Sequence, residues 1–151
     1  MKLKLYQKNI LSVLVIVVGG LILFNLAFLL TALVTNAVIS FSGKEQFGAV
    51  HMIGRGLSVL LILLISWLVL RSHLNDTIKA TFLTMPLMVI LVIIGISFYE
   101  QSKWVVAGIG ALIICALIFY LYKKKLPWLY YFSTFYVAAL ALYVLLSGMD
   151  I

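Results

Sequence analysis

Residues 87–94 read Leu-Met-Val-Ile-Leu-Val-Ile-Ile, an apolar run that no polar side chain interrupts. The run lies inside a longer apolar segment, 77–98, which matches the ~20 residues that a helix needs to cross a ~30 Å hydrocarbon layer. Strands of a membrane barrel alternate lipid-facing and lumen-facing side chains, and this run does not alternate. Because backbone groups in a bilayer must be hydrogen-bonded internally, we expect a transmembrane helix here.

Four further apolar segments cover 10–34, 48–70, 104–122 and 127–146. Hydrophobic residues make up 66% of the 151-residue chain and charged residues only 10%, whereas about a quarter of the residues of a soluble domain are charged. We therefore expect an all-α, polytopic integral membrane protein, with residues 1–151 forming a single domain, a bundle of five transmembrane helices. The stretch 10–41 would span about 48 Å as one helix, so residues 35–47 are expected to form an outer loop.

Basic residues are distributed unevenly between the two ends of these segments. Eight of the 11 lysines and arginines fall on one side of the bilayer: Lys2, Lys4, Lys8, Arg71, Lys79, Lys123, Lys124 and Lys125. The other side carries Lys44, Arg55 and Lys103, together with three of the four acids, Glu45, Glu100 and Asp150. Since basic loops are retained in the cytoplasm, the N-terminus is expected in the cytoplasm and the C-terminus outside.

The net charge of +7 is scattered over segment ends and does not form one solvated basic face. This pattern argues against nucleic-acid binding and favours membrane anchoring. The expected location is the cytoplasmic (inner) membrane of a bacterium, as a multi-pass protein in contact with membrane lipid.

The second segment contains an arginine at an unusual depth. Its strictly apolar part, 57–70, gives only about 21 Å of helix, so crossing requires the preceding turns back to Gly48. That brings His51 to the outer interface and Arg55 below it, where an arginine is costly unless it snorkels or finds an acceptor. One interpretation is a structural pair with lipid phosphate or an outer-loop acid. The other is an outward-facing pocket of Arg55 and His51 for an anionic headgroup or small acid.

A polar stripe runs along the first segment, because Asn25, Ala32, Asn36 and Ser40 share one face of a helical wheel. Polar side chains in spanning helices usually face protein. The stripe is therefore either a helix–helix hydrogen-bonding seam or the wall of a small polar cavity. The predicted ligand-binding residues are thus Asn25, Asn36, Ser40, His51 and Arg55.

The sequence lacks the features of catalysis and of ion coupling. No segment has an Asp or Glu at its centre, and neither G-x-S-x-G nor H-E-x-x-H occurs. His51 and His73 fall at opposite membrane faces, about 33 Å apart along a helix, so they do not share a metal. We expect no enzymatic activity, no metal site and no cofactor.

The expected function is that of a non-enzymatic subunit or accessory component of a membrane complex, assembled with itself or with larger partners. A small-residue face on the fourth segment supports this, because such faces let helices approach closely; it comprises Ala107, Gly108, Gly110 and Ala111. The alternative is a small transporter, flippase or lipid- or anionic-solute-binding protein that uses the pocket around Arg55.

Overall fold

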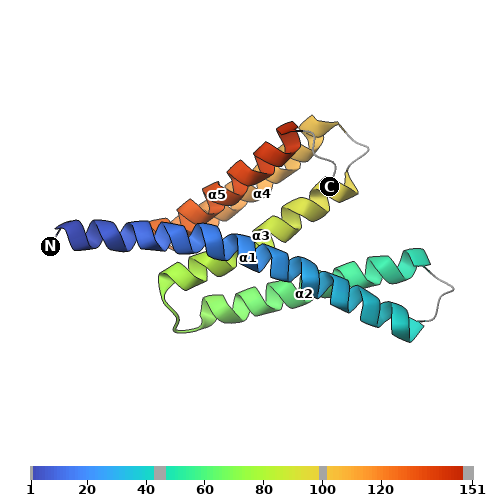
Figure 1. Cartoon of the computed structure of the whole chain (residues 1–151). Helices are drawn as coiled ribbons and strands as arrows, with labels where there is room; N and C mark the ends of the chain where they lie inside the picture. The colour runs from blue at the N-terminus through green and yellow to red at the C-terminus, as the bar shows by residue number, and fades with distance from the viewer. Residues whose placement is uncertain (1, 43–46, 99–101, 148–151) are drawn as a thin grey trace.

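The computed structural model describes residues 2–42, 47–98 and 102–147, and the side chains of 2, 3, 42 and 47–51 lie outside this description. Within these ranges the chain forms five helices (Figure 1), namely α1 (Lys2–Ser42), α2 (Phe47–Arg71), α3 (Asp76–Ser97), α4 (Lys103–Lys123) and α5 (Trp128–Ser147). All five are long and apolar enough to cross a membrane, which indicates a multi-pass membrane protein. Helices α2 to α5 begin and end within one residue of the ranges expected from sequence.

Helix α1 extends beyond the expected range, 10–34, at both ends, since it begins at Lys2 and ends at Ser42. Residues 35–42 are helical and continue α1 without a break. The prediction of a loop that begins at residue 35 is therefore wrong. Residues 43–46 lie outside the described chain. The segment contains neither Gly nor Pro before Gly43, and Thr35 packs against Gly54 of α2. Pairing with α2 therefore supports helical structure beyond the length that a bilayer alone requires.

Helix α3 is the centre of the bundle and contacts each of the other four helices. Helices α1 and α2 pack together on one side of it, and α4 and α5 lie side by side on the other (Figure 1). Across the described residues, α2 contacts neither α4 nor α5. The N-terminal turns of α1 extend past the other helices (Figure 1).

Close approach between α1 and α3 depends on a glycine pair. A Cβ on Gly19 would lie 2.8 Å from Thr81 Cγ2, and one on Gly20 would lie 3.0 Å from Thr84 Oγ1. Thr84 is fully buried, and its hydroxyl donates to the Thr81 carbonyl at 2.6 Å. Small residues that admit a neighbouring helix are a common basis of packing in membranes.

Three buried clusters follow α3 along its length. The first joins α1, α3, α4 and α5 at the end of the bundle that carries Arg71, Lys79 and Lys123–Lys125, which we call the lysine-rich end; it contains Ile16, Ala80, Leu83, Leu121 and Tyr130. The second joins α1, α2 and α3 through Ala27, Ile62 and Met85. The third joins α3 to α5 through Leu87, Met88 and Val137.

Two buried serines on α2 provide a test of polar packing. Ser58 donates to the Arg55 carbonyl at 2.8 Å, whereas the Ser66 hydroxyl has no partner among the described residues. An unsatisfied buried hydroxyl costs about 1 kcal/mol or more. We predict that Ser66→Ala raises the free energy of unfolding by about 1 kcal/mol and that Ser58→Ala lowers it, as measured by heat unfolding in detergent micelles. An equal loss in both variants would contradict this.

Candidate functional site

The predicted pocket around Arg55 is only partly covered by the structure. Arg55 lies near the start of α2 with its side chain exposed. Its neighbour Gly54 faces Thr35 of α1 and is buried. The side chain of His51 lies outside the described residues, as do the three acids expected on the same side, Glu45, Glu100 and Asp150. The pocket therefore stays a prediction.

The polar stripe of α1 faces away from the other described helices, so a hydrogen-bonding seam or cavity wall within this chain does not form there. Asn25, Ala32, Asn36 and Ser40 are all exposed. Asn25 Nδ2 donates to the Leu21 carbonyl at 2.8 Å, and Ser40 Oγ donates to the Asn36 carbonyl at 2.9 Å, both within α1. The stripe is turned outward because α1 buries its opposite face, which carries Ser12, Ile16, Gly20 and Ala27.

The level of Asn25 along the bundle follows from its neighbours. Ala27 packs against Met85, and Phe24 packs against the cluster that contains Met88. Met85 and Met88 lie at the middle of α3, which spans Asp76–Ser97. In a bilayer that α3 crosses, Asn25 therefore presents its carboxamide near the centre of the hydrocarbon.

The exposed face around Asn25 has the spacing of a coiled-coil seam. Successive steps of four and three residues connect Leu11, Val15, Val18, Ile22, Asn25, Leu29, Ala32 and Asn36, all of which are exposed. Alternation of three and four residues is the geometry by which one helix packs along another. We call this set the exposed seam of α1.

The small-residue face predicted on α4 is divided between two environments. Gly110 is buried, and a Cβ there would lie 3.5 Å from Leu91 of α3. Gly108 and Ala111 are exposed, and a Cβ on Gly108 would meet nothing within 4 Å among the described residues. Half of the face therefore packs within the bundle, and half faces outward.

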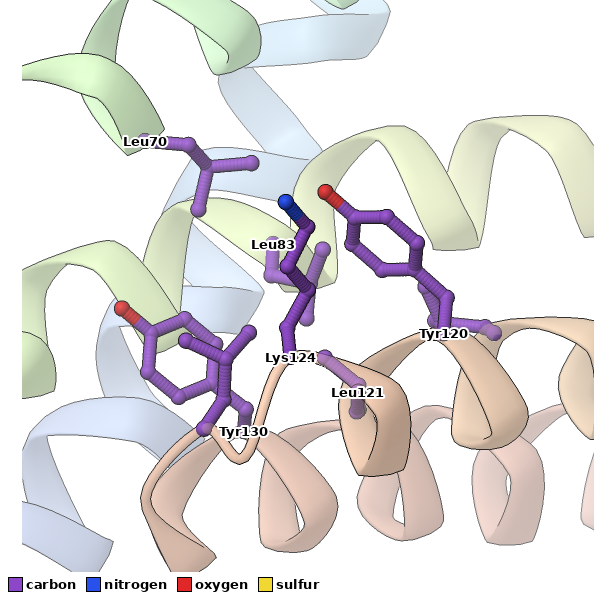
Figure 2. Close-up of a pocket in the computed structure, with 8 residues that line it drawn as sticks. Leu70, Leu83, Tyr120, Leu121, Lys124 and Tyr130 are labelled. Atoms are coloured by element: carbon purple, nitrogen blue, oxygen red, sulfur yellow. The ribbon is translucent and has the colours of Figure 1, made fainter.

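A cavity of about 250 Å³ lies at the lysine-rich end, where α2 stands apart from α4 and α5 (Figure 2). Its walls are mainly leucines, including Leu70 of α2 and Leu83 of α3. Its polar side chains are Tyr120, Lys124 and Tyr130. In Figure 2, Lys124 and Tyr120 extend from the end of α4 with their polar atoms directed to the same space.

The turn after α4 fixes the position of Lys124. Lys125 has a φ of 51° and so lies in the left-handed region. The N–H of Leu126 donates to the Leu121 carbonyl at 3.2 Å, and the N–H of Lys125 donates to the Tyr122 carbonyl at 3.1 Å. This is a Schellman motif, which usually brings together the two apolar residues at its ends. Here these are Leu121 and Leu126, both in the cavity wall.

Tyr130 closes the other side of the cavity. It is buried, with 3% of its surface exposed. Its hydroxyl donates to Asp76 Oδ1 at 3.4 Å and so connects α5 to the first turn of α3. Asp76 is the one acid among the described residues, and it shares the lysine-rich end with Arg71, whose guanidinium lies 5.3 Å from the centre of the Trp67 ring.

Sequence reasoning did not identify this cavity. It used Lys123–Lys125 only to orient the chain, and it did not consider Tyr120 or Tyr130 as site residues. One local signal was present, because Tyr120 and Lys124 are four residues apart and so share a helix face. Their approach to Leu70 and Leu83 depends on tertiary packing, which spacing does not reveal.

Comparisons with known proteins assign the chain to no family. It matches no protein-family model, no curated protein sequence and no solved structure. Evidence for function is therefore confined to the chain's own residues, above all the exposed seam of α1 and the cavity beside Lys124.

Proposed function

We propose that this protein is a non-enzymatic subunit of a membrane assembly and that it associates with a second copy of itself through the exposed seam of α1. We further propose that it resides in the cytoplasmic membrane of a bacterium, with its N-terminus in the cytoplasm and its C-terminus outside. The orientation is supported by the excess of lysine and arginine at one side of the chain.

The observation that carries this proposal is the exposed carboxamide of Asn25 at mid-bundle level. Asn has two donor hydrogens and an acceptor oxygen, and the described contacts use Nδ2 alone, toward the Leu21 carbonyl. Lipid tails offer no hydrogen-bond partner, so the remaining capacity is unmet unless another chain supplies it.

A second copy of the chain is the partner that fits this seam best. Copies inserted in one membrane share one orientation, so a two-fold axis along the membrane normal brings the two Asn25 side chains to the same level. Each carboxamide then donates to the oxygen of the other. Continued toward the N-terminus, the same three- and four-residue steps reach Lys8 and Lys4. Lysines of two copies would repel each other there, so the seam ends at Leu11. Contact is thus expected over the stretch from Leu11 to Asn36.

The test is disulfide cross-linking in native membranes, in a Cys115→Ser background because Cys115 is exposed. Ile22→Cys and Leu29→Cys place a thiol on the seam on either side of Asn25 and keep the Asn25 side chain. Both variants are therefore expected to give cross-linked dimers. Leu26→Cys is the matched control: Leu26 is 51% exposed but lies about 100° around the helix from Asn25.

Addition of Asn25→Leu to the Ile22→Cys chain is expected to weaken association about 3- to 30-fold, from about 0.6–2 kcal/mol for an interhelical polar contact. The readout is the cross-linked fraction as a function of protein-to-lipid ratio. Equal cross-linking at Leu26→Cys, or no effect of Asn25→Leu, would refute association through this seam.

A further inference from the structure

We infer that the cavity at the lysine-rich end binds the phosphate of an anionic phospholipid, with Lys124 and Tyr120 as its contacts. This inference does not depend on self-association, because the cavity lies between α2, α3, α4 and α5 and shares no residue with the exposed seam of α1. It requires that the bundle is embedded in lipid, and it rests on the proposed orientation, with the lysine-rich end on the cytoplasmic side.

The cavity is a lateral opening in the bundle. It exists because α2 stands apart from α4 and α5 across the described residues, so that Leu83 of α3 forms part of its wall. Its volume of about 250 Å³ is below the ~300–1,000 Å³ of sites that enclose a drug-sized molecule. A ligand therefore enters with one part only, and the rest remains in the surrounding lipid.

The lining selects an amphiphile with an anionic head. The leucine walls suit methylene groups, and the Lys124 ammonium, with three donors, suits a phosphate oxygen. Tyr120 adds a phenol on the same side of the cavity (Figure 2). Basic pockets between transmembrane helices on the cytoplasmic side are typical sites for anionic lipid headgroups.

Charge around the opening supports an anion over a zwitterion. The lysine-rich end presents five basic side chains, Arg71, Lys79, Lys123, Lys124 and Lys125. The acid at this end, Asp76, accepts the hydrogen bond of Tyr130. All three consecutive lysines are exposed, but Lys124 lines the cavity, and Lys123 and Lys125 do not. A bound phosphate should therefore depend on Lys124 more than on its neighbours.

The experiment compares lipids and matched lysine variants. The full chain is purified in an uncharged detergent, and binding is followed by the shift in heat-unfolding midpoint as phosphatidylglycerol is added. Phosphatidylglycerol is expected to raise the midpoint of the wild type, whereas phosphatidylcholine and inorganic phosphate are not. Lys124→Gln is expected to weaken phosphatidylglycerol binding about tenfold or more, because a hydrogen bond to a charged group is lost. Lys123→Gln, with the same loss of charge, is expected to bind as the wild type does.

A second variant keeps the test decisive if Lys124→Gln does not fold. Leu70→Trp retains every charge but fills the cavity from its α2 side, and it is expected to abolish the stabilisation. Equal losses in Lys124→Gln and Lys123→Gln would show diffuse attraction instead of a site and would overturn the inference. Stabilisation by phosphatidylcholine would also overturn the inference. Stabilisation by inorganic phosphate would overturn it too, because the cavity would then bind a free anion and not a lipid.

Discussion

Gly54→Leu is expected to lower the free energy of unfolding by about 1–3 kcal/mol, whereas Gly56→Leu on the same helix is expected to change it by a few tenths. A Cβ on Gly54 would lie 3.0 Å from Thr35 Oγ1 and 3.1 Å from Thr35 Cα. A Cβ on Gly56 would meet nothing within 4 Å among the described residues. Both changes add the same side chain to α2, so their difference isolates the α1–α2 contact.

The clash at Gly54 is costly because one of the atoms that it meets belongs to backbone. A flexible side chain could rotate away, but relief at Thr35 Cα requires α1 and α2 to separate, and the surrounding contacts oppose this. The measurement is heat unfolding in detergent followed by tryptophan fluorescence. The midpoint of Gly54→Leu is expected about 2 to 12 °C below that of Gly56→Leu.

A compensating change sharpens this experiment. Thr35→Ala removes the Oγ1 that lies closest to the added Cβ, so Gly54→Ala combined with Thr35→Ala should be more stable than the sum of the single changes. Because Thr35 Cα stays in place, the pair is expected to recover only part of the loss. Equal midpoints for Gly54→Leu and Gly56→Leu would mean that Thr35 and Gly54 are not in contact.

The location of the helices could be predicted from sequence, because apolar segment length and the charges between segments constrain it directly. The C-terminal end of α1 could not be predicted in this way. Hydropathy locates the part of a helix that lipid requires, whereas residues 35–42 stay helical through pairing with α2 at Thr35 and Gly54. A loop was predicted there on bilayer thickness alone, which sets no upper limit on helix length.

The face by which each helix packs could not be predicted in the same way. In a chain of 66% hydrophobic residues, nearly every face of a helix is apolar, so periodicity does not distinguish protein from lipid. The stripe with Asn25 and Asn36 was correctly grouped on one face of α1, but that face is exposed, and the buried face is the one with Gly20. Side-chain size decided the packing here, and side-chain polarity did not.

The cavity residues were beyond sequence reasoning for a different reason. Lys124 is one of three adjacent lysines, and no local feature separates it from the other two. Its role depends on the left-handed backbone at Lys125 and on the gap between α2 and α4. The lysine run was sufficient to predict orientation, but a binding site requires the positions of Leu70 and Leu83 as well.

Ile62→Ala is expected to lower the free energy of unfolding by about 1–3 kcal/mol, and Ile53→Ala by less than about 0.5 kcal/mol. Both isoleucines lie on α2, but Ile62 is 1% exposed within the cluster of Ala27 and Met85, whereas Ile53 is 55% exposed. In a soluble protein, truncation of a buried isoleucine costs about 2–5 kcal/mol, from lost transfer energy and the cavity left behind. Lipid tails are as apolar as the side chain, so the transfer contribution is small, and the lost packing contacts account for most of the effect.

Chemical or thermal unfolding in lipid bicelles, with both variants measured side by side, gives the comparison directly. Ile53→Ala should leave the free energy of unfolding nearly unchanged, because Ile53 faces lipid and acyl chains fill the space that its side chain leaves. If Ile53→Ala instead lowers the free energy of unfolding as much as Ile62→Ala does, the surface around Ile53 is covered by protein. Ile53 is not part of the exposed seam of α1, so self-association would then involve α2. If neither change has an effect, the α1–α2–α3 cluster around Ile62 does not hold these helices together, because dispersion contacts in a tightly packed cluster cannot be lost without cost.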